Sequence, residues 1–177
     1  MRLLKEFYRN EGLNIGGKTI SREAARAIIR QANQVLMVYS PVNKDYKFPG
    51  GGIKERESHE EALVREIKEE CGVMLTEVED SFGFVVEYAK AREEIYDVYR
   101  QISYYYLCRV NPRFLGQNLD DYEQKLGFRP EWVNIDVALR KNQAVLSGKF
   151  GSIPRWTRRD TYVLEVLSNR KTDCSCW

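Results

Sequence analysis

Histidine and cysteine are scarce in this chain, which has one histidine and four cysteines among 177 residues. A zinc finger needs two pairs of such ligands, and no second pair is evident around His59. The cysteines are also too sparse for a secreted disulfide framework. They are Cys71, Cys108, Cys174 and Cys176. The last two could bind a soft metal or respond to oxidation, but we expect residues 170–177 to form a loose tail.

Long apolar runs and an excess of one charge are also lacking. No apolar run approaches the roughly 18 residues that suggest a transmembrane helix. The 28 basic and 26 acidic residues leave a net charge of +2, which does not indicate a strongly basic nucleic-acid surface. The apolar fraction of 43% is too high for a disordered protein. The N-terminus becomes charged before a signal-peptide apolar region could form. We therefore expect a cytoplasmic protein that binds neither membranes nor nucleic acid polymers.

The domain organisation is predicted to be simple. The length suits a single domain over residues 1–177, and no repeat or linker divides it. Residues 1–19 are polar and form either a short leading strand or an arm. Segments rich in β-branched and aromatic residues predict strands at 24–30, 34–40, 81–88, 94–99 and 101–110. A tight loop at 31–33 joins the first two strands.

Helical patterns cover 58–70, 134–143 and 158–168. In the first of these, Ser58 and Glu61 have the spacing of a capping box, and Gly72 suits the helix end. The polar stretch 111–129 is predicted to be a long loop. Strand hairpins beside separate helices indicate an α+β fold.

The first helix carries an unusual cluster of carboxylates. With Leu63 at zero on a helical wheel, Glu70, Glu66 and Glu69 lie near −20°, −60° and −120°, beside the apolar stripe. Two such charges about 6 Å apart repel by roughly 3 kcal/mol at an effective dielectric near 20. A hard divalent cation, Mg²⁺ or Mn²⁺, would relieve this repulsion. The glycine-rich turn at 50–52 leaves room for a phosphate. The residues therefore predict a metal–phosphate site.

Residues 51–73 resemble the Nudix box, G-x5-E-x7-R-E-U-x-E-E-x-G-U, in which U is apolar. Its defined positions are met by Gly51, Glu57, Arg65, Glu66, Ile67, Glu69, Glu70, Gly72 and Val73. The flanks, Phe48 to Gly52 and Pro130 to Val133, also look like the family. Arg56 lies where relatives commonly have glycine, just before the first glutamate of the box. This departure concerns the geometry of the turn and not the activity. The resemblance implies a Nudix fold, with a mixed sheet between helices and a loop–helix–loop motif.

The resemblance also implies a chemistry, the Mg²⁺-dependent hydrolysis of a nucleoside diphosphate linked to another group, most simply a nucleoside triphosphate. Carried over residue by residue, the metal ligands are Glu66, Glu69, Glu70 and the Gly50 carbonyl, and Glu57 holds Arg65. The general base is either a box glutamate or a glutamate on a distal loop. For the distal loop, Glu123 is the candidate and Glu131 the rival.

Two other functions remain open from the sequence. A catalytically silent module of the same fold would sense nucleotides by binding them. An interaction protein would instead use the helix predicted at 158–168. The family also makes a homodimer plausible.

Overall fold

The computed structural model describes residues 1–148 and 151–173. The described strands are β1 (Leu3–Tyr8), β2 (Thr19–Gln31), β3 (Gln34–Ser40), β4 (Asp45–Lys47), β5 (Gly50–Gly52), β6 (Met74–Lys90), β7 (Val98–Asn111) and β8 (Arg129–Asn134). The described helices are α1 (His59–Cys71), α2 (Asp121–Lys125), α3 (Ile135–Leu146) and α4 (Thr157–Asp173).

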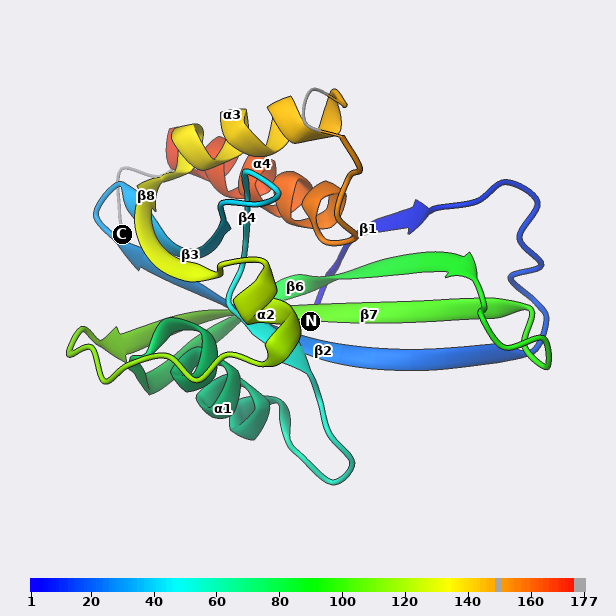
Figure 1. The fold of residues 1–177 in the computed structure, drawn as a ribbon, viewed down its shortest axis with the longest axis horizontal. Helices are drawn as coiled ribbons and strands as arrows, with labels where there is room; N and C mark the ends of the chain where they lie inside the picture. Colours follow the sequence, from blue (N-terminus) through cyan, green and yellow to red (C-terminus); the bar gives the residue numbers. More distant parts are fainter. Residues whose placement is uncertain (149–150, 174–177) are drawn as a thin grey trace.

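The strands form one mixed sheet with the order β1-β6-β7-β2-β3-β4. β1 pairs with β6, and β2 with β7, in parallel; the other pairs are antiparallel. β5 pairs with β2, and β8 pairs with β3. The long strands β2, β6 and β7 extend well beyond the helices (Figure 1).

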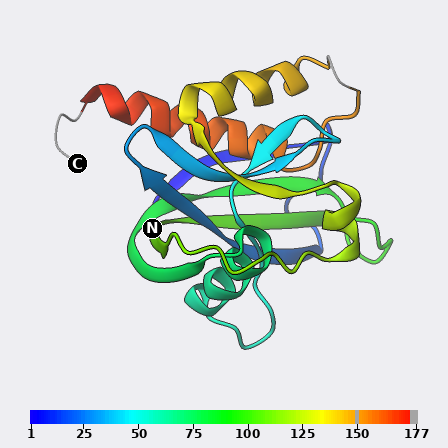
Figure 2. The same ribbon diagram turned by 60° about the vertical axis from the view of Figure 1, so that its left-hand side comes forward.

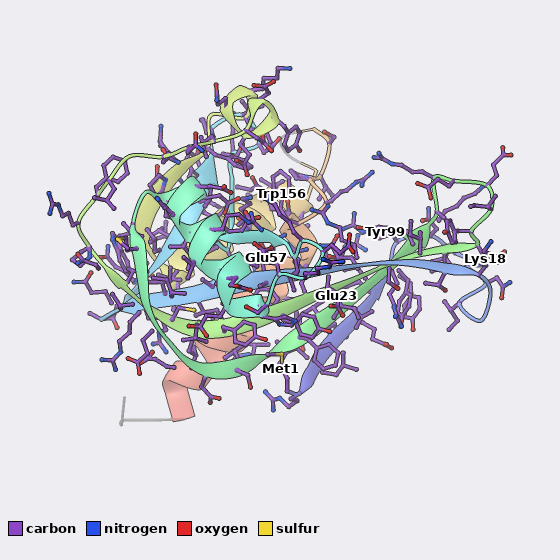
Figure 3. The ribbon with its side chains drawn as sticks, turned by 90° about the horizontal axis from the view of Figure 1, so that it is seen from below. Met1, Lys18, Glu23, Glu57, Tyr99 and Trp156 are labelled. Atoms are coloured by element: carbon purple, nitrogen blue, oxygen red, sulfur yellow. The ribbon has the colours of Figure 1, made fainter. Side chains whose placement is uncertain are left out.

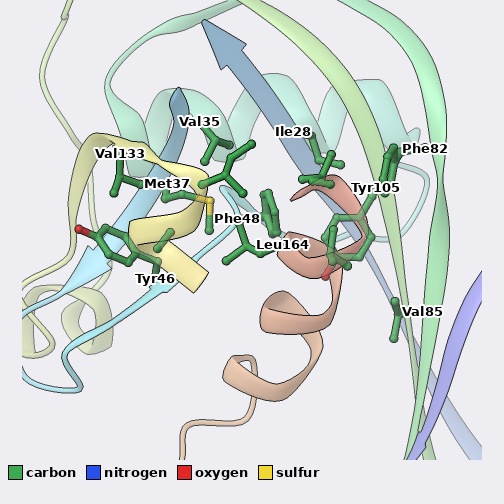
Figure 4. Packing of buried hydrophobic residues seen from close by; sticks show 14 residues of the cluster. Ile28, Val35, Met37, Tyr46, Phe48, Phe82, Val85, Tyr105, Val133 and Leu164 are labelled. Atoms are coloured by element: carbon green, nitrogen blue, oxygen red, sulfur yellow. The ribbon is translucent and has the colours of Figure 1, made fainter. Parts of the chain in front are cut away.

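Helices cover both faces of the sheet. α3 and α4 lie together on one face and α1 on the other, as the two ribbon views show (Figures 1 and 2). Residues 24–29 of β2 are buried on both faces of the sheet, so alternate side chains of this segment pack against helices on opposite sides. Ile28 packs with Tyr105 and Leu164 on the α4 side (Figure 4), while Ala27 and Ile29 pack against α1. The predicted α+β fold, with a mixed sheet between helices, is confirmed.

The capping prediction for α1 is confirmed. The Ser58 hydroxyl accepts from the backbone of Glu61, and the Glu61 carboxylate accepts from the backbone of Ser58. Gly72 ends the helix with φ of 64°, the left-handed conformation that favours glycine. Local sequence chemistry therefore fixes both ends of the helix that carries the carboxylates.

The strand predicted at 94–99 is wrong over most of its length. β6 and β7 form a hairpin in which Lys90 pairs with Val98, so residues 91–97 make the connection between the two strands. The Asp97 carboxylate accepts a hydrogen bond of 2.7 Å from the backbone N–H of Lys18, which ties this connection to the start of β2. Without a neighbouring strand to pair with, residues 94–97 cannot continue the sheet.

The long loop predicted at 111–129 is also corrected, because it contains α2 and ends as β8 begins. Asp120 and Glu123 form a capping box like that of α1. β8 adds to the edge of β3 and was missed, since Pro130 weakens the strand pattern. The loop therefore holds one helical turn at a fixed position.

Both ends of the chain have more structure than the sequence suggests. Residues 3–8 form β1, so the strand alternative for the start of the chain is correct. α4 continues to Asp173, into the segment predicted as a tail. Cys174 and Cys176 lie outside the described residues, whereas Cys71 and Cys108 are buried free thiols. Within residues 1–148 and 151–173, no helix is long and apolar enough to cross a membrane.

Candidate functional site

The glycine-rich turn forms β5 and packs directly against β2. Gly50 pairs with Arg26, and its φ of 129° favours glycine. A Cβ at Gly50 would lie 2.2 Å from the Ala25 carbonyl oxygen, and one at Gly51 would lie 2.2 Å from the Glu66 Oε1. Glycine at these positions therefore lets the turn approach both the sheet and the α1 carboxylates.

The three predicted carboxylates of α1 differ in exposure. The side chain of Glu70 is 1% exposed and that of Glu66 13%, whereas that of Glu69 is 36% exposed. Glu70 accepts a hydrogen bond of 2.8 Å from the Gly50 N–H and pairs with Lys47. Burial, then the neighbouring Glu70 charge, raises the pKa of Glu66. Glu66 and Glu70 thus lie against the turn, whereas the Glu69 side chain contacts Arg65.

Arg65 and Glu57 hold the loop before α1 against the helix. Arg65 Nε and Nη2 donate to the two oxygens of Glu57 at 2.7 and 2.9 Å. Nη2 also donates to the Gly52 carbonyl at 3.0 Å, and Nη1 to Glu66 at 2.6 Å. Hydrogen bonds from the Arg65 guanidinium lower the pKa of Glu57 to about 2. Arg65 therefore links the turn, the loop and the helix.

Glu123, from the capping box of α2, lies beside the Glu70–Lys47 pair. Its Oε1 is 3.9 Å from Lys47 Nζ, although 53 residues separate it from Glu70 in the sequence. Burial and the nearby Glu70 carboxylate raise the pKa of Glu123 to about 7. The rival Glu131 is engaged elsewhere, because it accepts from Tyr46 Oη at 2.8 Å and from Arg129 at 2.7 Å.

Sequence reasoning missed three charged residues that support the turn. Lys47 is buried against Glu70, and the Arg26 guanidinium donates to the Gly50 carbonyl. From α4, Asp160 accepts from the Phe48 N–H at 3.1 Å. Arg26 could have been recognised from the sequence, because it is a charged residue inside the apolar run 24–29. No local pattern marks Asp160, because it contacts the turn across 112 positions.

A hard divalent cation suits the donor chemistry of this cluster, since the donors are carboxylate and carbonyl oxygens from one helix and one turn. Lys47, Arg65 and Arg26 now neutralise these oxygens. Within the described ranges, no three acidic, histidine or cysteine side chains converge closely enough to hold a metal ion. Metal binding would therefore require these carboxylates to exchange contacts with Lys47 and Arg65 for contacts with the ion.

Comparison with known proteins identifies the family. The NUDIX domain model matches residues 20–151. An RNA pyrophosphohydrolase of Nitratiruptor sp. is 37% identical over 76 residues, which are 41% of this chain and 49% of that protein. A CTP pyrophosphohydrolase of Escherichia coli is 36% identical over 58 residues, 30% of this chain and 43% of that protein. The chain thus matches less than half the length of these curated relatives.

A solved structure shares the fold. A NUDIX hydrolase from Nitrosomonas europaea superposes with a TM-score of 0.56 and 20% identity, covering 85% of this chain and 90% of that one. The family model covers most of this chain, including the whole box, but it ends before α4. The chain belongs to the NUDIX family.

Proposed function

We propose that this chain is a pyrophosphohydrolase that depends on Mg²⁺ or Mn²⁺ and cleaves a nucleoside diphosphate linked to another group. The observation that carries the proposal is the convergence of Glu66 and Glu70 on the backbone of Gly50 and Gly51. The curated relatives, which are pyrophosphohydrolases of RNA and of CTP, support the reaction class. A nucleoside triphosphate is the simplest substrate.

The proposed ligands are Glu66, Glu69, Glu70 and the Gly50 carbonyl. A bound divalent cation would neutralise the pyrophosphate and acidify a water molecule. Glu57 orients Arg65, which holds the turn in place and adds positive charge near the phosphates. The rest of the chemistry is positioning and charge neutralisation, as in phosphoryl transfer generally.

Glu123 is the proposed general base. Its pKa of about 7 suits a group that accepts a proton near neutral pH, and its position beside Glu70 brings it to the same cluster. Glu131 is the weaker candidate because Tyr46 and Arg129 already occupy its oxygens.

A steady-state assay of phosphate or pyrophosphate release tests the proposal. The panel includes nucleoside triphosphates, CTP among them, dinucleoside polyphosphates, ADP-ribose, nucleotide sugars and 5′-triphosphorylated RNA, each with Mg²⁺ and Mn²⁺. We expect Glu66→Gln and Glu70→Gln to lower kcat by roughly 10²–10³-fold. Glu60→Gln, an exposed change on the same helix, is the matched control. Equal rates in all four proteins would overturn the site assignment.

The alternative is a nucleotide-sensing module of the same fold. One observation favours it: Lys47 and Arg65 already neutralise the carboxylates that a cation would need. This function predicts nucleotide-dependent thermal stabilisation without turnover of any panel member. A homodimer and a cytoplasmic location stay predictions, which sedimentation and cell fractionation test.

A further inference from the structure

A cavity of about 560 Å³ lies away from α1, on the long strands of the sheet. Two pairs of neighbouring strand residues contribute to its lining. Ile20 pairs with Tyr99 across β2 and β7, and Arg22 pairs with Gln101 in the next row. Tyr99 donates a hydrogen bond of 3.0 Å to Gln101, which fixes the ring in this lining. Figure 3 shows Tyr99 on the strands that extend toward Lys18.

The walls of this cavity carry a surplus of positive charge. Five basic and two acidic side chains line it. One of the acids, Glu87, is already neutralised, because Arg9 and Arg159 pair with it at 2.5 and 3.0 Å. The other is the exposed Glu93. We call this cavity the basic pocket.

Four of the basic side chains have no counter-ion in the part of the chain that the structure describes. Among residues 1–148 and 151–173, none of the four makes a side-chain hydrogen bond or ion pair. They are Arg22, Lys90, Arg92 and Arg155. They come from β2, the end of β6, the 91–97 connection and the segment before α4, so the fold gathers them from four places. Clustered like charges repel, and an external anion would relieve that repulsion.

The basic pocket and the candidate site share one edge of the turn. A Cβ at Gly52 would lie 2.6 Å from Arg22 Nη2, so this guanidinium lies against the turn backbone. On the same glycine, the carbonyl accepts from Arg65. A phosphate chain held at the turn could therefore continue along Arg22 into the basic pocket.

We propose that the basic pocket binds a distal phosphate of the substrate. The substrate class is a nucleotide that carries a further phosphate beyond the pyrophosphate cleaved at α1, and this inference rests on the proposed function. Tyr99 and Ile20 offer a flat platform for a base or sugar, while Lys90, Arg92 and Arg155 bind the distal phosphate. That phosphate belongs either to a dinucleoside polyphosphate or to the phosphodiester of a short 5′-triphosphorylated oligonucleotide.

Equilibrium binding by the full chain in EDTA tests the proposal without turnover. The ligands are diadenosine tetraphosphate, a 5′-triphosphorylated dinucleotide, and ATP, which lacks a distal phosphate. The double variant Arg92→Glu/Arg155→Glu should weaken binding of at least one distal-phosphate ligand by about tenfold or more per lost contact. The loss for ATP should be threefold or less. The wild-type protein should bind one of the two distal-phosphate ligands more tightly than the other. That ligand identifies the source of the phosphate as a dinucleoside polyphosphate or a 5′-triphosphorylated oligonucleotide.

The matched control is Arg113→Glu/Arg140→Glu, which changes net charge equally at two exposed arginines outside the pocket. It should leave all three affinities within about twofold. An equal loss in the control, or an equal loss for ATP, would overturn the pocket assignment. If the wild type hydrolyses substrate but the pocket variant binds all ligands as tightly as the wild type, the pocket assignment is overturned and the proposed function stands. Pocket-dependent binding without turnover in any metal would overturn the proposed function and leave the pocket as a ligand site.

Discussion

The two charged regions of this protein are built in opposite ways. Around the turn, buried and half-buried carboxylates pair with cations of the same chain, as the buried Glu70 pairs with Lys47 and the half-buried Glu57 with Arg65. In the basic pocket, exposed cations such as Lys90 and Arg92 have no anionic partner among the described residues. Charges of the first kind are part of the folded core. Charges of the second kind contribute little to folding and are available to a ligand.

Replacing a lysine by methionine in each region should give the largest difference in the free energy of unfolding. Lys47→Met leaves the Glu70 carboxylate buried without its cation, and we expect the free energy of unfolding to fall by about 3–5 kcal/mol. Lys90→Met, at an exposed and unpaired lysine, should change it by about 0.5 kcal/mol or less. Urea unfolding in metal-free buffer measures both. Similar losses in the two variants would contradict the contrast.

Asp45 is the exception near the turn, because no cation of the described residues pairs with this buried carboxylate. Oδ2 accepts from Thr157 at 2.7 Å, and Oδ1 has no hydrogen-bond partner among the described residues. Burial raises the pKa of Asp45 from 3.8 to about 6. Since the folded state binds this proton more tightly, its stabilising contribution is complete below pH 3.8 and is lost as pH rises through about 6.

We expect this titration to cost about 3 kcal/mol of unfolding free energy between pH 4 and 7. Asp45→Asn has no proton to lose, so its stability should lack this fall. Urea midpoints for both proteins at several pH values measure the difference. Parallel profiles for wild type and variant would contradict it.

A milder test keeps the charge at the turn but changes its geometry. Arg65→Lys retains the cation and loses the two-pronged contact with Glu57, so we expect a loss of about 1–2 kcal/mol. Because Arg65 lowers the pKa of Glu57 to about 2, this contribution is present above about pH 4.5 and disappears as pH falls toward 2. Thermal unfolding across that range would show the two proteins converging in acid; a constant gap would rule out the Glu57 contact as its cause.

The smallest effect is expected in the basic pocket. Arg92→Gln removes one of several like charges, so stability should rise by a few tenths of a kcal/mol at low salt. The gain should vanish near 1 M salt, where the Debye length is about 3 Å. Scanning calorimetry at two salt concentrations measures it. A loss of stability at low salt would mean that Arg92 has a structural role.

The helix that carries the proposed ligands was predictable from the sequence. Ser58, Glu61 and Gly72 act within a few positions of one another, so the helix and its carboxylate sector were readable from spacing alone. The long loop at 111–129 was predicted without its helical turn, although Asp120 and Glu123 carry the capping pattern that was recognised at Ser58.

The charged residues that support the turn could not be predicted, because tertiary packing brings them together. Lys47 looks like an ordinary strand lysine until the fold brings its amine to Glu70 of α1. The basic pocket likewise contains Arg22 and Arg155 from distant segments of the chain. Neither is distinctive in a sequence with 28 basic residues. Pairing registers and helix packing decide these contacts, and short sequence windows hold no record of them.

The bond between Asp160 and the backbone of Phe48 has a consequence for biosynthesis. The turn emerges from the ribosome more than a hundred residues before the helix that holds it. During translation the nascent chain therefore contains the full Nudix box before the Asp160 hydrogen bond to the turn can form. The turn gains the Asp160 hydrogen bond only after α4 has left the exit tunnel, so this contact forms late relative to the synthesis of the box.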